Sequence, residues 1–510
     1  MSVTPQAFHF HLQKLADLEQ KTEKYLIAYS GGVDSHVLLH LCSQLKNSPS
    51  GFDQSFSAVY IDHGLSSESK KWGKHCQHIC FELDIPLTII DVDARPEKGQ
   101  SPEASARTAR YQAFSQILNE NECLLTAQHL DDQAETLLLQ LLRGSGAKGL
   151  SAMPKIRPFS KGYLCRPILD YKKKDILEYA RQHQLKWIED ESNLEQRFER
   201  NYLRHSVIPL LEKRWPAVKE NFAKSAEVLA ESQFLLDEMA DSDIQKLYFV
   251  NADGTTEYDK LLIEPMLKYL RCDDQHVEQQ QLPSLQKNSL HNSFHTGIHS
   301  GQEYARLNNL LRHWINLNHF PMPSKKILEQ IVHAVIQARE DAMPLVSWKR
   351  DVFHCEVRRY RDKLYLLDVS FPPAEQQQEQ EYILHEDQEV SLKNTQSYIK
   401  LFAANDNVKQ KGFDRQKLFS KTITIRFRKG GERFRKNAKG HSHSLKHWFQ
   451  EAGIPPWERE HMPLIYWGDE LLQIGNHIVN DSLKNSYQSH LKNEESDDLL
   501  SIHWQRFENK

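Results

Sequence analysis

One six-residue loop constrains the fold of this 510-residue chain more than any other stretch: Ser30, Gly31, Gly32, Val33, Asp34 and Ser35. An apolar run at 25–29 precedes the loop, and a helical pattern of apolar residues follows it from 36 to 45. Strand, glycine loop and helix in this order form a phosphate site in α/β proteins, because glycines let backbone N–H groups approach closely and the helix N-terminus adds positive potential. A simple glycine turn with a serine cap is the alternative, and the register of all three elements disfavours it.

Asp34 gives this loop a different chemistry from the GxxxxGK[ST] phosphate loop, in which a lysine follows the glycines. A carboxylate beside a phosphate is repulsive unless a cation bridges the two groups. Mg²⁺ prefers oxygen ligands and is commonly shared between carboxylates and phosphates. We therefore expect Asp34 to be a Mg²⁺ ligand.

Composition excludes several classes of protein. The formal net charge is -4, so any nucleic-acid surface must be a local basic patch. The seven cysteines are scattered without a Cys-x-x-Cys pair, which argues against a disulfide framework and against a zinc site. No apolar run is long enough to cross a bilayer, and residues 1–19 do not resemble a signal peptide. We expect a cytoplasmic protein with roughly two to four domains and no membrane contact.

Strand and helix patterns alternate through the N-terminal third, with apolar strand patterns at 25–29, 56–61, 86–92 and 123–127. This alternation predicts an α/β fold with a doubly wound, mainly parallel sheet. Ligands of such sheets bind at the carboxyl ends of the strands. Polar residues follow three of the expected strands: the loop at 30–35, Asp62 and His63 at the second, and 129–135 at the fourth.

Two carboxylates, Asp132 and Glu135, stand three residues apart at an expected helix start and so share a face. Together with Asp34 they suit either Mg²⁺ or the ammonium group of an amine substrate. An acidic first turn that only satisfies the helix dipole remains an equal alternative.

Basic residues of the same region suggest contacts with phosphate. Arg107, Arg110 and Arg143 suit a triphosphate or a nucleic-acid backbone, or else a solvated helix face. Spacings of three and four place Arg197, Arg200 and Arg204 on one helical face. That stripe suggests an RNA backbone or a nucleotide, with an interdomain salt-bridge face as the alternative.

The remainder of the chain divides into two expected domains. Residues 216–345 are read as a small helical domain with a polar, loop-rich insertion at about 250–302, and 346–510 as an α+β domain. Within 421–459, ten lysines and arginines, Arg433 and Arg435 among them, face three glutamates, and five aromatic residues are interleaved. Such a surface is typical of RNA recognition, and a solvated basic face with core aromatics is the alternative.

Several blocks together resemble the PP-loop ATP pyrophosphatase superfamily and, within it, the tRNA(Ile)-lysidine synthetase family. They are SGGVDS at 30–35, DHG at 62–64, EASARTARY at 103–111, TAQHLDDQAET at 126–136, LLRGSG at 141–146, WIEDESN…RFERNYLR at 187–204 and IPPWER at 454–459. One departure is Gln128, where the family usually has histidine. Glutamine keeps hydrogen bonding but cannot titrate near neutral pH, whereas His129 is retained.

The resemblance implies a two-step reaction on a tRNA(Ile) with a CAU anticodon, which changes codon reading from AUG to AUA. ATP adenylates the C2 oxygen of the wobble cytidine and pyrophosphate leaves; free L-lysine then attacks C2 and AMP leaves. It implies ATP binding by Ser30–Ser35, Asp62 and His63, with Mg²⁺ on Asp34 and Asp132. Catalysis would use Asp34, Asp132, Glu135, Arg107 and Arg143, and tRNA would contact Arg110, Arg197, Arg200, Arg204, Arg433 and Arg435.

Three other readings stay open at this point, together with the choice between monomer and homodimer. A PP-loop tRNA thiolase usually needs a cysteine pair, which this chain lacks. A glutamine-dependent synthetase would carry an amidotransferase region, also missing. A catalytically idle tRNA-binding adaptor is disfavoured by the presence of Asp34, Asp132 and Glu135.

Overall fold

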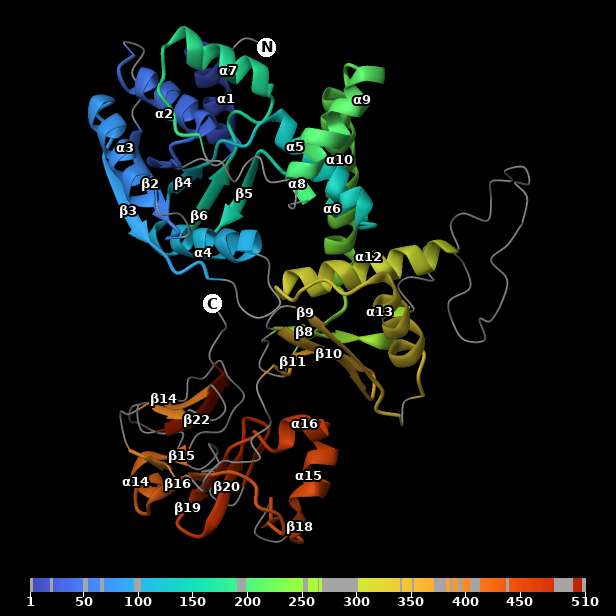
Figure 1. The fold of residues 1–510 in the computed structure, drawn as a ribbon. Coiled ribbons are helices and arrows are strands. Elements are labelled where there is room, and N and C mark those ends of the chain that lie inside the picture. Colours follow the sequence, from blue (N-terminus) through green and yellow to red (C-terminus); the bar gives the residue numbers. More distant parts are fainter. Residues whose placement is uncertain are drawn as a thin grey trace, which may run out of the picture. The chain divides into compact units, whose positions relative to one another are not determined.

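The computed structural model forms two compact units, Met1–Leu236 and Asp237–Lys510 (Figure 1). The residues that it describes are 3–18, 22–48, 54–64, 68–95, 102–189, 199–250, 256–264, 266–267, 301–339, 342–350, 353–370, 382–385, 389–392, 397–403, 413–436, 440–480 and 499–506. Among these residues, no helix is long and apolar enough to pass through a bilayer.

A six-stranded sheet of order β3-β2-β1-β4-β6-β5 forms the centre of the first unit. All its neighbouring strands are parallel except the edge pair β5 and β6, so the expected mainly parallel sheet is confirmed. The strands are β1 (Lys24–Ala28), β2 (Ser55–Asp62), β3 (Leu87–Asp91), β4 (Glu122–Leu125), β5 (Ile156–Phe159) and β6 (Gly162–Cys165).

Helices cover both faces of this sheet, as the doubly wound arrangement requires (Figure 1). The helices of the first unit are α1 (Pro5–Leu18), α2 (Val33–Lys46), α3 (Ser69–Glu82), α4 (Pro102–Ile117), α5 (Leu130–Leu142), α6 (Ala147–Leu150), α7 (Lys173–Gln182), α8 (Glu199–Tyr202), the π-helix Leu203–Val207, α9 (Ile208–Arg214) and the start of α10 (Val218–Ile244).

Alternation along the strands creates a separate core on each face. In β1, Tyr25 and Ile27 join the larger core with α1, α2, α3 and α7, whereas Leu26 joins a smaller core with Phe114 of α4. Successive side chains of a strand point to opposite faces, so a fully apolar strand is buried on both sides. The carboxyl ends of β1, β2 and β4 are thereby fixed at one edge.

The second unit begins with an antiparallel sheet of order β7-β8-β11-β10-β9. Helices from the 301–336 region pack on this sheet through a core that includes Trp314 and Leu328. Ser324 is an N-cap and accepts a hydrogen bond from the backbone N–H of Ile327 at 3.4 Å. The elements are β7 (Tyr248–Val250), β8 (Thr256–Leu262), α12 (Gly301–Leu317), α13 (Lys325–Gln330), the π-helix Ile331–Ile336, β9 (Leu345–Arg350), β10 (Phe353–Tyr360) and β11 (Lys363–Asp368).

This sheet corrects two details of the expected helical domain. The loop-rich reading of 250–302 does not hold for 256–262, which form β8 and pair with β11. The helical reading of 216–345 also did not include the strands β7 and β8. Alternation in β8 is partial, with Leu261 buried and Tyr258 exposed, so polar neighbours concealed the strand pattern.

The last part of the chain has two larger antiparallel sheets, β12-β16-β19-β20-β21 and β13-β14-β22-β15, and the pair β17-β18. Among the residues described in this part, three helices accompany the sheets, which agrees with the expected α+β class. The elements are β12 (Tyr382–Leu384), β13 (Val390–Leu392), β14 (Ser397–Ala403), β15 (Phe413–Asp414), α14 (Arg415–Leu418), β16 (Ile423–Arg426), β17 (Arg433–Phe434), β18 (His443–Ser444), α15 (Leu445–Glu451), α16 (Pro456–Arg459), β19 (Leu464–Trp467), β20 (Glu470–Ile474), β21 (Ile478–Val479) and β22 (Leu499–Arg506).

Candidate active site

The glycine loop lies between β1 and α2 and has a shape that only glycine permits. Gly31 has φ +82°, and a Cβ there would come within 2.5 Å of Ile188 Cδ1. The backbone N–H of Ile188 also donates to Gly31 O at 2.9 Å, so a distant segment closes over the loop. Gly32 is the N-cap of α2 and has no side chain to cap the first turn. The loop thus combines backbone N–H groups with a helix N-terminus, as anion sites do.

Two serines hold the loop in this shape. Ser35 Oγ donates to Gly32 O at 2.9 Å and accepts the backbone N–H of Ser30 at 3.2 Å. The hydroxyls of Ser30 and Ser35 are 3.1 Å apart. The first turn of α2 therefore keeps its position without a ligand, which lowers the entropy lost on binding one.

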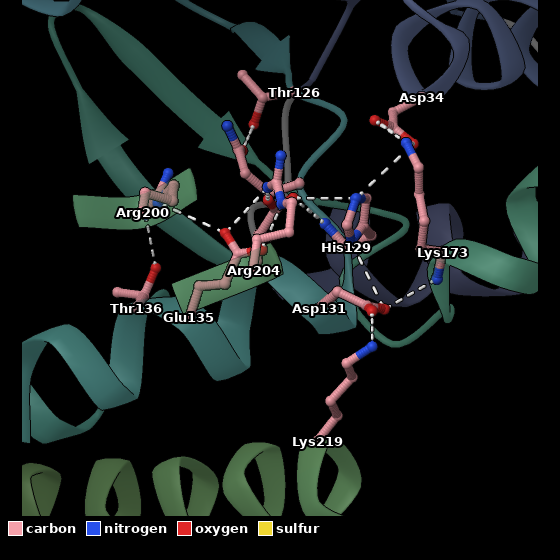
Figure 2. Close-up of polar contacts among 12 residues, drawn as sticks. Asp34, Thr126, His129, Asp131, Glu135, Thr136, Lys173, Arg200, Arg204 and Lys219 are labelled. Carbon is pink, nitrogen blue, oxygen red and sulfur yellow. Dashed lines mark hydrogen bonds and ion pairs between the residues drawn. The ribbon is translucent and has the colours of Figure 1, made fainter. Parts of the chain in front are cut away.

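Asp34 lies in the first turn of α2 and faces a lysine from another element. Lys173 Nζ, at the start of α7, is 2.6 Å from Asp34 Oδ1 and 2.7 Å from Oδ2. The buried His129 lies on the other side, with Nε2 3.7 Å from Asp34 Oδ1. Figure 2 shows Lys173 and His129 converging on Asp34.

His129 also connects Asp34 to the carboxylates of α5. Its Nε2 is 3.4 Å from Asp132 Oδ2, and that oxygen accepts the backbone N–H of His129 at 3.0 Å. Asp131 Oδ1 contacts Lys219 Nζ of α10 at 2.5 Å, and its Oδ2 accepts the Lys173 backbone N–H at 2.9 Å. Burial raises the pKa of Asp131, but these hydrogen bonds outweigh it and hold the pKa below its ordinary value.

Glu135, one turn further along α5, is 1% exposed and pairs with two arginines. Arg204 donates to its two oxygens at 2.6 and 2.9 Å and to Asp132 Oδ1 at 3.1 Å. Arg200 Nε lies 3.6 Å from Glu135 Oε2, and its NH2 donates to Thr136 Oγ1 at 2.9 Å (Figure 2). Burial raises the pKa of Glu135, and the pair with Arg204 opposes that rise. Asp132 and Glu135 thus share one organic cation.

The arginines expected at tRNA occupy different environments. Arg200 and Arg204 contact carboxylates of the site, so these two residues of the expected stripe face inward within one unit. Arg197 lies outside the described residues. Arg433 is exposed, and its guanidinium binds Ser442 O. Arg435 is also exposed.

Arg110 lies beside the second strand end. Its guanidinium donates to His63 Nε2 at 3.1 Å. Burial and the charge of Arg110 lower the pKa of His63 to about 4, so the ring is neutral at pH 7. Asp62 Oδ1 accepts the Gly64 backbone N–H at 2.9 Å, which shapes the turn after β2.

Arg107 and Arg143 lie apart from the carboxylates. The Arg107 guanidinium stacks over Tyr111 with 4.8 Å to the ring centroid. Arg143 pairs with the exposed Glu199 at 2.9 Å. Gln128, at the position where the family usually has histidine, is held by Thr126 Oγ1 at 2.5 Å.

Lys173, Lys219 and Asp131 are site residues that sequence reasoning missed. Lys173 stands in a run of three lysines followed by Asp175, which reads as an ordinary solvated helix start. Lys219 lies 88 positions from Asp131 in the chain, so no local spacing connects them. Both lysines stand at the starts of helices, at 173 and 219, and this is the one sequence feature that they share. Lysine is common at such positions, so the signal is weak.

The side chains near the loop include few oxygen donors for the expected Mg²⁺. The described residues include no group of three or more His, Cys, Asp or Glu side chains that could hold a metal ion. Mg²⁺ commonly takes only one or two carboxylates, together with phosphates and water. Asp34 fits that pattern, because its side chain is partly exposed and its oxygens contact one lysine ammonium. Asp132 fits less well, because its oxygens already serve His129 and Arg204.

Family comparisons match three parts of the chain. Residues 5–211 match a family described as a PP-loop domain, 301–365 the TilS substrate binding domain, and 423–499 the TilS substrate C-terminal domain. The tRNA(Ile)-lysidine synthase of Coxiella burnetii (strain RSA 493 / Nine Mile phase I) is 39% identical over 456 residues, covering 89% of each chain. The chain belongs to the tRNA(Ile)-lysidine synthase family.

Other members of the tRNA(Ile)-lysidine synthase family are similar along the same length. The protein of Legionella pneumophila (strain Paris) is 37% identical and covers 90% of this chain and 92% of its own. That of Methylococcus capsulatus (strain ATCC 33009 / NCIMB 11132 / Bath) is 35% identical, with 88% and 91% covered. The similarity therefore extends well beyond the PP-loop domain, which disfavours the thiolase and synthetase alternatives.

Proposed function

We propose that the chain attaches free L-lysine to C2 of the wobble cytidine in tRNA(Ile) with a CAU anticodon, using ATP and giving lysidine. One observation supports this most: a phosphate loop and a carboxylate pair lie in one site, linked by His129. Its Nε2 is within 3.7 Å of Asp34 on the ATP side and 3.4 Å of Asp132 on the other side. The two half-reactions need these two kinds of subsite next to each other.

In the first step the cytidine C2 oxygen attacks the α-phosphorus of ATP, a P–O bond to pyrophosphate breaks, and pyrophosphate leaves. Positioning and charge neutralisation dominate such phosphoryl chemistry. The backbone of Ser30–Ser35 would hold the phosphates, and Lys173 Nζ is the nearest fixed cation to the loop carboxylate. Asp62 and His63 would line the nucleotide side. Mg²⁺, when bound to Asp34, would supply further neutralisation between phosphate oxygens.

In the second step the lysine amine attacks C2, the C2–O bond breaks, and AMP leaves with the oxygen. The amine must be held and oriented before it attacks. Asp132 and Glu135 already bind the guanidinium of Arg204, so they are suited to an organic cation. We propose that the lysine substrate binds at this pair, and that Arg204 orients the two carboxylates or moves aside.

The other units would supply tRNA binding. We propose residues 1–215 as the catalytic domain, 216–368 as a tRNA-selecting domain and the rest of the chain as a basic tRNA-binding domain. The boundary expected at 345/346 moves to the end of β11, because β9, β10 and β11 form one sheet with β8. Arg433 and Arg435 are exposed on the last of these domains, and Arg107, Arg110 and Arg143 are candidates within the catalytic domain. Because tRNA, ATP and lysine meet in the cytoplasm, we also propose that location.

The test is incorporation of labelled lysine into two transcripts, tRNA(Ile) with a CAU anticodon and tRNA(Met) with the same anticodon. With ATP and Mg²⁺, we expect incorporation into the first and little into the second, with one AMP released per lysine. Sulfur transfer or amide formation in place of lysine incorporation would reject the proposal. Equal labelling of both transcripts would reject its tRNA(Ile) specificity.

A further inference from the structure

The block at 454–459 contacts the antiparallel sheet near the start of the second unit, rather than belonging to the basic surface around it. Arg459, counted in the sequence as one of ten cations, is 9% exposed. It donates to Ile454 O at 2.7 and 2.9 Å and to the Tyr360 hydroxyl at 3.2 Å. Its guanidinium is therefore buried between the backbone of its own block and Tyr360 of β10, and not on the basic surface.

Trp457 of this block contacts two aromatic residues and an arginine of the sheet. Its ring lies edge-on to Tyr365 of β11, with centroids 5.3 Å apart, and to Tyr360 at 6.1 Å. The Arg358 guanidinium lies over the same ring, 4.9 Å from its centroid. Aromatic pairs in this geometry and a stacked cation stabilise a contact beyond the area that it buries.

Charges from both sides complete the contact. Lys260 of β8 has its Nζ 2.9 Å from Glu257 Oε2 and 3.5 Å from Glu458 Oε1, with Lys260 and Glu458 side chains both 13% exposed. Arg361, at the turn between β10 and β11, donates to the Gln450 backbone carbonyl. We call this set of contacts the joint: Lys260, Arg358, Tyr360, Arg361 and Tyr365 on the sheet, with Gln450, Trp457, Glu458 and Arg459 opposite.

The joint connects the two segments that match separate substrate domains of the family. Four of its sheet residues lie at 358–365, within the match at 301–365, and its partners lie within the match at 423–499. We propose that the joint makes these two domains one rigid body, so that both engage a single tRNA, and that Trp457 and Arg361 are positioning residues for tRNA binding. This inference rests on the proposed function for its tRNA part only.

A joint between two binding domains raises the effective concentration of the second domain at a tRNA that the first has bound. Two binding domains held at a fixed separation engage one ligand without the entropy cost of ordering them. Released from the joint, they would stay linked by the chain but would sample many separations. Affinity for tRNA should then fall roughly tenfold or more, while the chemistry in the first unit continues at saturating tRNA.

Some substitutions should open the joint while each domain stays folded. Arg361 is exposed and has φ +55°, which Asn also tolerates, so Arg361→Asn keeps the turn and removes the contact. Arg350 on β9 is exposed as well, and Arg350→Asn is the matched control for charge. Trp457 Nε1 is buried without a partner among the described residues, so Trp457→Phe should preserve the joint. Trp457→Ala should open it.

The first measurement is a distance between the two domains in the free protein. Spin labels would be attached through Lys349→Cys and Lys446→Cys, both at exposed positions, with Cys272→Ser because the other six cysteines are buried. We expect one narrow distance for the parent, Trp457→Phe and Arg350→Asn, and broad distributions for Trp457→Ala and Arg361→Asn. A broad parent distribution, or narrow ones for both opened variants, would overturn the joint.

The second measurement is tRNA affinity beside kcat. We expect the Kd for tRNA to rise about tenfold in Trp457→Ala and Arg361→Asn. The kcat and the KM for ATP should stay within about twofold of the parent values. Trp457→Phe should bind tRNA as the parent does. Opened variants that bind tRNA as tightly as the parent would overturn the positioning role. The distance measurement uses neither tRNA nor ATP, so a failed lysine assay with the parent would reject the proposed function without deciding the joint.

Discussion

Lys173 and Asp34, 139 residues apart in the chain, form a two-point ion pair, with Nζ 2.6 and 2.7 Å from the carboxylate oxygens. The pair joins the start of α7 to the loop that carries the proposed ATP site. Each side chain is about one-third exposed, so a ligand can reach both. This contact fixes the direction of the Asp34 carboxylate before any nucleotide arrives.

Replacing Lys173 by Met should reduce pyrophosphate release by on the order of 10²-fold, because the loop loses its nearest cation. Lys174→Met is the matched control, since Lys174 is the exposed neighbour on the same helix. The rate of ATP–pyrophosphate exchange with saturating tRNA measures the effect. Equal rates for the two variants would remove Lys173 from the site.

Asp34→Asn should reduce the rate of pyrophosphate release by a factor of roughly 10² or more, while the affinity for tRNA stays within about twofold of the parent value. The amide has the shape of the carboxylate but no charge for Mg²⁺ or for Lys173. Asp170→Asn, at an exposed ion pair with Lys155, is the control. A Mg²⁺ titration of the residual rate gives a second readout: an unchanged Mg²⁺ midpoint would contradict a metal role for Asp34.

Glu135→Gln should raise the KM for lysine more than the KM for ATP, because the proposed amine subsite loses half its charge. The substitution also leaves Arg204 facing a neutral, buried partner, and breaking such a pair commonly costs about 3–5 kcal/mol. Thermal unfolding must therefore be measured beside the kinetics. A variant that folds and shows an unchanged KM for lysine would place the amine elsewhere.

Acid should destabilise the first unit through His40, which is buried and hydrogen-bonded to the Tyr179 hydroxyl at 2.9 Å. Burial, with His183 nearby, lowers its pKa from 6.5 to about 4. Between pH 6.5 and 4 the unfolded chain therefore binds a proton at His40 that the folded chain does not bind. The free energy of unfolding has its full value above pH 6.5 and decreases as the pH falls toward 4. At pH 5 the loss from this group is about 2 kcal/mol.

The unfolding temperature at pH 7 and pH 5 measures this effect. His40→Gln, which can still bond Tyr179, should shrink the difference between the two temperatures. His78→Gln, at an exposed histidine of α3, should leave it unchanged. Identical pH dependence in the parent and His40→Gln would show that His40 is not the responsible group.

Reversing Arg433 and Arg435 to Glu should weaken tRNA binding and flatten its salt dependence, because each lost phosphate contact lowers the slope by about 0.7–0.9. The same double reversal at Lys70 and Lys74, exposed one turn apart on α3, is the control. Binding measured at several salt concentrations decides between them. A salt slope equal to that of the parent would show that Arg433 and Arg435 do not contact tRNA phosphates.

Local patterns predicted the parts of the site that follow one another along the chain. The loop at 30–35 and the carboxylates at 132 and 135 stand at strand ends that alternation and turn chemistry make visible. The pairing of Arg204 with Glu135 was not predictable, because the spacing of arginines shows a shared face but not what that face meets. Lys173 and Lys219 were missed for the same reason.

The C-terminal region shows a second limit of sequence reasoning. Phe434, Trp448 and Phe449 were read with the basic residues around them as one RNA surface, yet all three are buried. Alternation in a short strand such as β17 places an exposed Arg433 beside a buried Phe434, so neighbours in sequence belong to different environments. The aromatics therefore form core, while the cations remain on the surface.

The contact of Ile188 with Gly31 has a consequence for folding during translation. The loop leaves the ribosome early, but its partners at 173 and 188 are translated much later. A nascent chain that ends after β6 has the phosphate loop without Lys173 and without the backbone bond from Ile188. Contacts so distant in sequence form slowly. We therefore expect full nucleotide affinity to appear only after more than a third of the chain has been synthesised.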